Sequence, residues 1–310
     1  MLQTPIAAES AAEATRGGFN AGETILEHVS NSSIDQPLIH LSKVFGIDLS
    51  VTKHVLMLWI VAAIVFGFIT WAVRKFLRQE RPVPDAFMAL IEIVVEFVRD
   101  DIVQPNVGHK WVRVWTPLVL TLFLFILVAN TFGLIPVFDA IGLVDHWVHP
   151  ASDGFFARVV HGGPTATGNY NVTAALATIT FVATIIAGTR AHGFLRHWKN
   201  LVPPGLAWPL YIMLIPIEIL GMFVRPFALT MRLAANMMGG HIALLAVISF
   251  VFIFAGLFGG AVAGVGVGMI VSVPLAVGMS ALEIIVILVQ AYVFTLLTAV
   301  FIGMAIHAHH

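Results

Sequence analysis

Four ionisable side chains in a strongly apolar region are the residues of this chain whose chemistry most needs an explanation. Residues 201–306 carry only Glu218, Arg225, Arg232 and Glu283 as formal charges. An ionisable group at bilayer depth costs about 2.5–3.5 kcal/mol on insertion scales, which makes it a candidate for function by default. Acids, amides and bases arranged through a membrane are what a proton pathway requires.

The spacing of these residues predicts that several of them share one helix face. Glu218, Arg225 and Arg232 follow one another at intervals of seven residues, so their face drifts by only about 20° per step. Asn236 lies one turn beyond Arg232 and stays near that face. His241 lies about 180° round a regular helix from Arg232, so it need not face the same partner. A histidine there suits a proton relay, although a local hydrogen bond would equally explain it.

A second polar stripe is predicted near the end of the chain, where Glu283 and Gln290 are again seven residues apart. Two antiparallel helices would then each present polar groups in an apolar setting. Arg225 and Arg232 could neutralise Glu218 and Glu283 as buried ion pairs that only hold the structure together. The alternative is that the stripes handle ions, which their run along the membrane depth favours.

The composition excludes most classes of protein. Of the 310 residues, 59% are hydrophobic and 11% are charged, against about 25% charged in an ordinary soluble domain. Too few polar side chains remain to cover a water-soluble surface, and the net charge of −1 gives no nucleic-acid-binding signature. Cysteine is absent, and no Gly-rich phosphate loop with Lys and Ser or Thr occurs. Cysteine nucleophiles and thiolate metal sites are therefore excluded, and nucleotide chemistry would belong to partner proteins. We expect no metal, no cofactor and no catalytic chemistry of the chain's own.

Apolar runs predict an all-α polytopic membrane protein with about five membrane-crossing helices, because one span needs about 20 apolar residues. Residues 233–282 carry no formal charge, and a single helix of that length would be about 75 Å long. Glycines cluster within this stretch, so we expect a turn near 256–268 between two long, strongly tilted helices that form a hairpin. The predicted spans are 54–73, 114–138, 171–189, 207–254 and 269–305.

Residues 83–104 predict a helix of another kind. Phe87, Ile91 and Val98 belong to a series of apolar residues at helical spacing, with acidic residues between them. This pattern is typical of an amphipathic helix lying in the membrane interface. The polar segment 1–50 precedes the membrane domain, which we assign to residues 51–310.

The basic residues predict the orientation of the chain. Most lysines and arginines lie in the three loops 74–81, 99–113 and 190–199. The positive-inside rule places these loops in the cytoplasm. Five crossings then leave the N-terminal segment outside and the C-terminus in the cytoplasm.

Several segments resemble subunit a of the F-type rotary ATP synthase, in the order that this family has them. The similarity covers about residues 50–305. Because His241 and Glu283 stand where other bacteria often carry Glu and His, the mitochondrial and alphaproteobacterial branch resembles this chain most. The segments are ANTFGLIP (129–136), NVTAALA (171–177), PLYIMLIPIEIL (209–220), RPFALTMRLAANMMGGH (225–241) and LEIIVILVQAYVFTLL (282–297).

This resemblance implies a role for each candidate residue. Arg232 matches the family's essential arginine, which faces the rotating c-subunit ring and separates two proton half-channels. Arg225 matches a basic position one heptad before it. The positions that match polar residues of the half-channels are Glu218, Asn236, His241, Glu283 and Gln290.

The resemblance also implies the surroundings of the chain. We expect a stator subunit in a bacterial inner membrane, in contact with lipid, the c-subunit ring, the peripheral-stalk b subunits and the rest of the ATP synthase. Three alternatives are a secondary transporter, a membrane-embedded hydrolase or metalloprotease, for which the HEXXH motif is absent, and a self-contained proton channel. A transporter would usually carry internal repeats, and the 218–241 pattern has no second copy. A channel would conduct protons without a c-ring.

Overall fold

The computed structural model describes residue 22 and residues 50–78, 86–134, 166–199, 208–257 and 261–307. Every regular element in these ranges is a helix, and five helices are long and apolar enough to cross a membrane. The prediction of an all-α polytopic membrane protein is therefore confirmed. The five candidate spans are His54–Leu77, Val112–Leu134, Tyr170–His192, Pro209–Val251 and Gly268–Ile306.

Three helices form the spans before the hairpin. α3 continues to Leu77, beyond the predicted end at residue 73, with Arg74 and Lys75 in its last turn. Long basic side chains favour the negative end of a helix and reach back to water from there. Residues 135–138, the end of the second predicted span, lie outside the described residues. The helices are α3 (Lys53–Leu77), α6 (Val112–Leu134) and α9 (Tyr170–His192), with a short 3₁₀ helix η2 (Ala166–Gly168) before α9 and α10 (Phe194–Lys199) after it.

The predicted amphipathic segment is helical and consists of three consecutive elements. Val98 and Ile102 are fully buried, whereas Arg99 and Asp100 are exposed and bond to each other at 2.7 Å. The helix ends at Val107 rather than at residue 104, and its first predicted residues, 83–85, lie outside the described ranges. Its position at a membrane interface stays a prediction. The elements are α4 (Ala86–Glu96), the π-helix η1 (Phe97–Val103) and α5 (Gln104–Val107).

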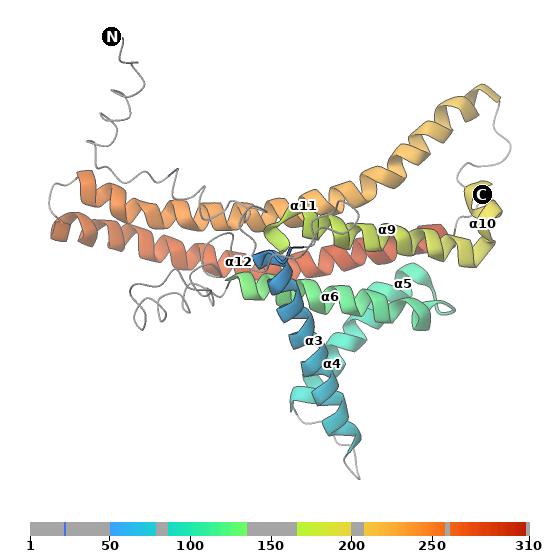
Figure 1. Cartoon of the computed structure of the whole chain (residues 1–310), viewed down its shortest axis with the longest axis horizontal. Coiled ribbons are helices and arrows are strands. Elements are labelled where there is room, and N and C mark those ends of the chain that lie inside the picture. Colours follow the sequence, from blue (N-terminus) through green and yellow to red (C-terminus); the bar gives the residue numbers. More distant parts are fainter. Residues whose placement is uncertain are drawn as a thin grey trace.

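The last two helices, α11 (Trp208–Leu257) and α12 (Ala261–Ile306), lie side by side as an antiparallel hairpin (Figure 1). The turn predicted over 256–268 is wrong for residues 256–257 and 261–268, which are helical, and residues 258–260 lie outside the described residues. A Cβ atom built on Gly268 would lie 2.7 Å from the Val251 Cα atom. This glycine therefore permits a close approach of the two helix backbones rather than a turn.

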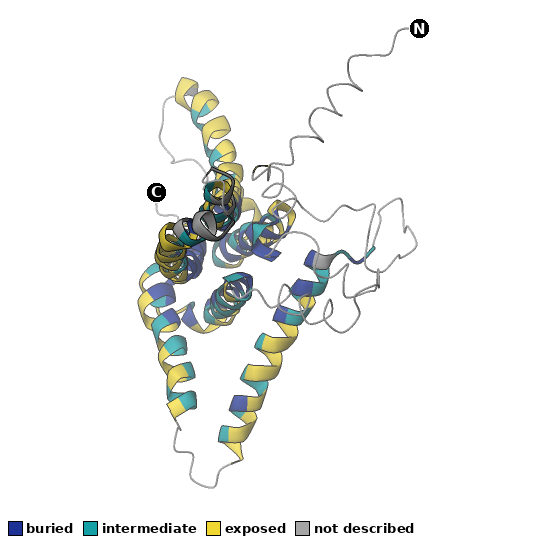
Figure 2. Ribbon diagram, turned by 90° about the vertical axis from the view of Figure 1, so that its left-hand side faces the viewer, coloured by how far each residue is buried: buried dark blue, intermediate teal, exposed yellow. Residues whose placement is uncertain are grey.

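The buried core lies where α6, α9, η1 and the C-terminal half of α12 meet, and α11 joins it through Leu229 and Leu233. Phe294 and Ile302 are the largest contributions of α12 to this core. By contrast, large apolar side chains stay exposed along much of α11, whose N-terminal part diverges from α12 (Figures 1 and 2). Lipid or another protein must cover this apolar surface.

Candidate functional site

The hairpin carries all seven candidate residues, and the structure brings six of them together in pairs. Arg232 lies between the pairs along α11. Two pairs join α11 to α12, and the third lies within α11. The pairs are Asn236 with Gln290, His241 with Glu283, and Glu218 with Arg225.

The first pair is a hydrogen bond between two amides. Asn236 donates from its Nδ2 atom to the Oε1 atom of Gln290 at 3.0 Å. Gln290 is buried, with 5% of its surface exposed, whereas Asn236 is exposed at the edge of the contact. Each amide can both donate and accept hydrogen bonds, so this pair can form part of a hydrogen-bonded chain without carrying a charge.

The second pair brings a carboxyl and an imidazole together in a buried place. The Nδ1 atom of His241 lies 3.8 Å from the Oε1 atom of Glu283, and both residues are less than 10% exposed. Gly240 makes this approach possible, because a Cβ atom there would lie only 3.1 Å from the same oxygen. The carboxyl therefore lies against the α11 backbone and reaches a histidine on the helix side away from Arg232.

The third pair is an ion pair within α11. The Nη2 atom of Arg225 lies 3.6 Å from the Oε1 atom of Glu218, and about a third of each side chain is exposed. The Arg225 guanidinium also lies 5.7 Å from the centre of the Phe301 ring of α12. A cation over an aromatic face is attracted by the ring quadrupole, so Arg225 is held from two sides.

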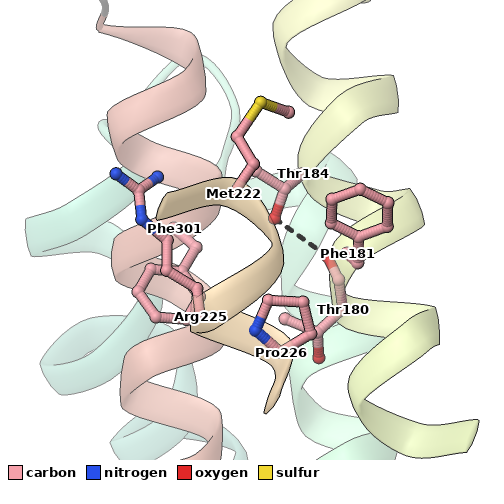
Figure 3. A pocket seen from close by; sticks show the side chains of 7 residues that line it. All are labelled: Thr180, Phe181, Thr184, Met222, Arg225, Pro226 and Phe301. Atoms are coloured by element: carbon pink, nitrogen blue, oxygen red, sulfur yellow. Dashed lines mark hydrogen bonds between the residues drawn. The ribbon is translucent and has the colours of Figure 1, made fainter. Parts of the chain in front are cut away.

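A small cavity adjoins Arg225 at the junction of three helices (Figure 3). Its volume is about 20 Å³, which is enough for one water molecule. Two threonines of α9 line it, and Thr184 donates a hydrogen bond to the Thr180 carbonyl at 2.9 Å. Thr180 also shares a buried hydrogen bond of 3.1 Å with Thr298 of α12. Polar groups thus continue from Arg225 into the contact between α9 and α12.

Arg232 differs from the other six residues. It is exposed, and among the described residues none lies within ion-pair or hydrogen-bond distance of its guanidinium. Ala228 and Ala235, which lie near it on α11, are exposed as well. A permanent cation therefore projects from a surface of small side chains, where the helices of a partner could approach closely.

The interpretation that the charged residues only hold the structure together fits only the part of α11 before Arg232. Glu218 is paired with Arg225, as that interpretation requires. Glu283 instead faces His241, and Arg232 pairs with neither acid. Thr180 and its neighbours could not be predicted from the sequence, because a threonine in an apolar helix gives no signal until the packing shows what it contacts.

Comparisons with known proteins show which family the sequence of this chain is similar to. Residues 55–303 match the family described as "ATP synthase A chain". A protein of Chlorobium luteolum named "ATP synthase subunit a 2" is 40% identical, over 92% of this chain and 76% of its own length. A protein of the same name from Prosthecochloris aestuarii is 37% identical, over 96% of this chain and 83% of its own.

A third relative, "ATP synthase subunit a" of Anaeromyxobacter dehalogenans, is 39% identical over 86% of this chain and 60% of its own length. The assignment to a mitochondrial and alphaproteobacterial branch stays a prediction. The family match spans the hairpin and the three preceding spans together, so it covers every candidate residue. The chain belongs to the ATP synthase A chain family.

Proposed function

We propose that this chain is the stator subunit of the membrane sector of a proton-driven ATP synthase in a bacterial inner membrane. It would pass protons between the two membrane faces by way of carboxylates on a neighbouring c-subunit ring. Peripheral-stalk b subunits would hold it against rotation. The N-terminal segment would lie outside and the C-terminus in the cytoplasm, as the distribution of basic residues favours.

The two sides of Arg232 would serve two half-channels. With the C-terminus in the cytoplasm, the start of α11 also lies towards the cytoplasm, because α11 and α12 are antiparallel. The Glu218–Arg225 pair then belongs to the cytoplasmic half-channel. Asn236 with Gln290 and His241 with Glu283 belong to the outer one.

Arg232 would separate the two half-channels and control the ring carboxylate. A carboxyl that is protonated from the outer half-channel is neutral and can turn through lipid, where an ionised one could not. When it meets the fixed cation of Arg232, its charged form is favoured and the proton leaves through the cytoplasmic half-channel. The guanidinium does not deprotonate, so no proton hops across it. The membrane potential supplies about 2.3 kcal/mol per charge per 100 mV.

The observation that carries this proposal is the exposed position of Arg232 between two sets of paired polar residues. Arg232→Ala should lower proton-driven ATP synthesis by roughly 1000-fold, the upper end of what one preorganised charge-stabilising donor contributes. The rate is measured in membrane vesicles with an imposed proton gradient, and the amount of assembled complex is measured in parallel. Near-normal synthesis by the assembled variant would refute the proposal.

The contact with the c-ring is tested separately. Cysteine is absent from the chain, so single introduced cysteines are clean probes. A cysteine at Ala228 or Ala235, both exposed, should cross-link to one placed beside the c-subunit carboxylate. The matched control is Phe87→Cys on α4, where the ring packs on Phe68 at 4.6 Å, away from the hairpin. If neither alanine position reacts while an established control pair does, the ring lies elsewhere.

A further inference from the structure

A cavity at one end of the helix bundle lies apart from the proton-handling residues. It lies where three parts of the chain come together: the segment from α5 to α6, the end of α9 and the end of α12. Its volume is about 310 Å³, near the lower limit of cavities that hold small molecules. It is therefore large enough for one compact polar group.

Basic side chains from all three parts line this cavity. His109 and Lys110 come from the segment before α6, His192 ends α9, and His307 follows α12. None of the described residues that line it is acidic. A cavity with one lysine, three histidines and no carboxylate attracts anions and repels cations.

The hydrogen bonds of two histidines strengthen this preference. His192 donates from Nε2 to the Ile306 carbonyl at 2.8 Å, and His307 donates from Nδ1 to the Gly303 carbonyl at 3.1 Å. Both acceptors belong to the last turn of α12, whose carbonyls form the negative end of that helix. The two rings thus cover negative partial charge. The positive N-terminal end of α6, which starts at Val112, lies directly after the cavity-lining segment.

A metal ion does not fit this set of residues. In the described part of the chain, no three His, Asp or Glu side chains come close enough together to hold one. The level of the cavity in the membrane favours a headgroup instead. Trp111 lies directly before the α6 span, and the Lys110 Nζ atom lies 5.5 Å from the centre of its ring. Tryptophan and lysine beside the start of a span mark the headgroup level of a bilayer.

We propose that this cavity binds a phosphate-bearing anion, either the headgroup of an anionic phospholipid or free phosphate. Basic pockets between membrane helices on the positively charged side are suited to anionic headgroups. Such a ligand would tie the ends of α6, α9 and α12 together. The inference does not depend on the proposed path of protons, because it uses none of the seven candidate residues.

The test is equilibrium binding to the full chain in detergent, counted by native mass spectrometry. The probes are short-chain phosphatidylglycerol, short-chain phosphatidylcholine and inorganic phosphate. Lys110→Gln should weaken binding of phosphatidylglycerol about fivefold, as expected for one charge near a membrane surface. Adding His109→Gln should weaken it further. Both residues are exposed, so the variants should fold, which circular dichroism checks.

Lys75→Gln is a matched control. Its Nζ atom also lies 5.5 Å from a tryptophan ring, that of Trp71, but Lys75 lies on α3, outside the cavity. This variant should bind phosphatidylglycerol as the unmodified chain does. Saturable binding of inorganic phosphate in competition with the lipid would identify free phosphate as a ligand. Binding of the lipid alone would identify the headgroup. Equal losses in the Lys110 and Lys75 variants, or equal binding of phosphatidylcholine, would overturn the proposal.

Discussion

The two parts of α11 on either side of Arg232 hold their polar side chains in different ways. Before Arg232, Glu218 and Arg225 pair within the same helix, and about a third of each side chain is exposed. After it, Asn236 and His241 reach across to α12, and their partners there are only 5% exposed. The first arrangement resembles a surface ion pair, whereas the second is part of the contact that joins the hairpin.

This difference has a physical consequence for each side. In a water-filled cytoplasmic half-channel, as proposed above, an ion pair of this exposure would contribute at most about 1 kcal/mol, so Glu218 and Arg225 could change partners at little cost. Polar groups buried between two helices are costly to leave unsatisfied, so Gln290 and Glu283 depend on how α11 and α12 pack. We therefore expect the outer half-channel to be the more sensitive to small changes in geometry.

The largest effect among these tests is expected at the boundary between the two parts. Arg232→Lys keeps a cation but loses the planar fork and the permanence of the charge. We expect synthesis to fall by roughly 100-fold, which is the general cost to an enzyme's rate when a reacting group is misplaced by about 1 Å. The same vesicle assay measures it, with passive proton leak recorded alongside. A variant with normal coupling would mean that any cation suffices at the boundary.

The buried side should respond next. Glu283→Gln keeps the shape of the side chain and removes its ability to take up a proton. Proton-driven synthesis should slow by roughly 10- to 100-fold, at or below the low end of what a positioned proton-transfer group contributes. Assembly should be unaffected, because a neutral amide is easier to bury than a carboxylate. Failure to assemble, with normal pumping by the complexes that remain, would make Glu283 structural.

The exposed side should respond less. Glu218→Gln removes the ion pair with Arg225, yet water in the proposed cytoplasmic half-channel would carry protons in place of the carboxylate. We expect synthesis to slow by about tenfold or less, below the usual contribution of a positioned proton-transfer group. Rates of the Glu218 and Glu283 variants are compared at equal amounts of complex. A greater loss at Glu218 would reverse the comparison between the two sides.

The smallest effect tests the geometry of the buried pair. Gly240→Ala places a Cβ atom 3.1 Å from a Glu283 oxygen, so the carboxyl must shift by a few tenths of an ångström. Synthesis should slow roughly fourfold for a shift of about 0.3 Å, if the logarithm of the rate falls in proportion to the displacement and a shift of about 1 Å costs roughly 100-fold.

Gly67→Ala on α3, outside the hairpin, is the control for this substitution, because nothing lies within 4 Å of the Cβ atom that it adds. Its activity should be normal, and the helix should gain about 0.5–1 kcal/mol from the loss of a glycine. Thermal melting of both variants separates the two effects. Equal rates for the two alanine variants would show that Glu283 tolerates displacement.

Much of the architecture can be predicted from the sequence because the bilayer imposes simple rules. A span needs about 20 apolar residues and must satisfy its own backbone hydrogen bonds, so runs of apolar residues locate helices directly. The predicted range 207–254 corresponds closely to α11, and the amphipathic pattern from Phe87 onward corresponds to a helix. Residue type and spacing also identified Arg232 as a charge that needs a function.

The partners of the polar residues followed from the packing of the helices. On a regular helix, His241 points away from Arg232, and nothing in the sequence indicates that Glu283 reaches it across Gly240. Gly268 belongs to a cluster of glycines that is typical of a turn, yet it lies where two helix backbones approach closely. A local pattern can predict which residues share a face of one helix. Which residue on another helix they meet depends on the helix crossing angle, the curvature of the helices and the space left where glycine has no side chain. These are properties of the assembled bundle.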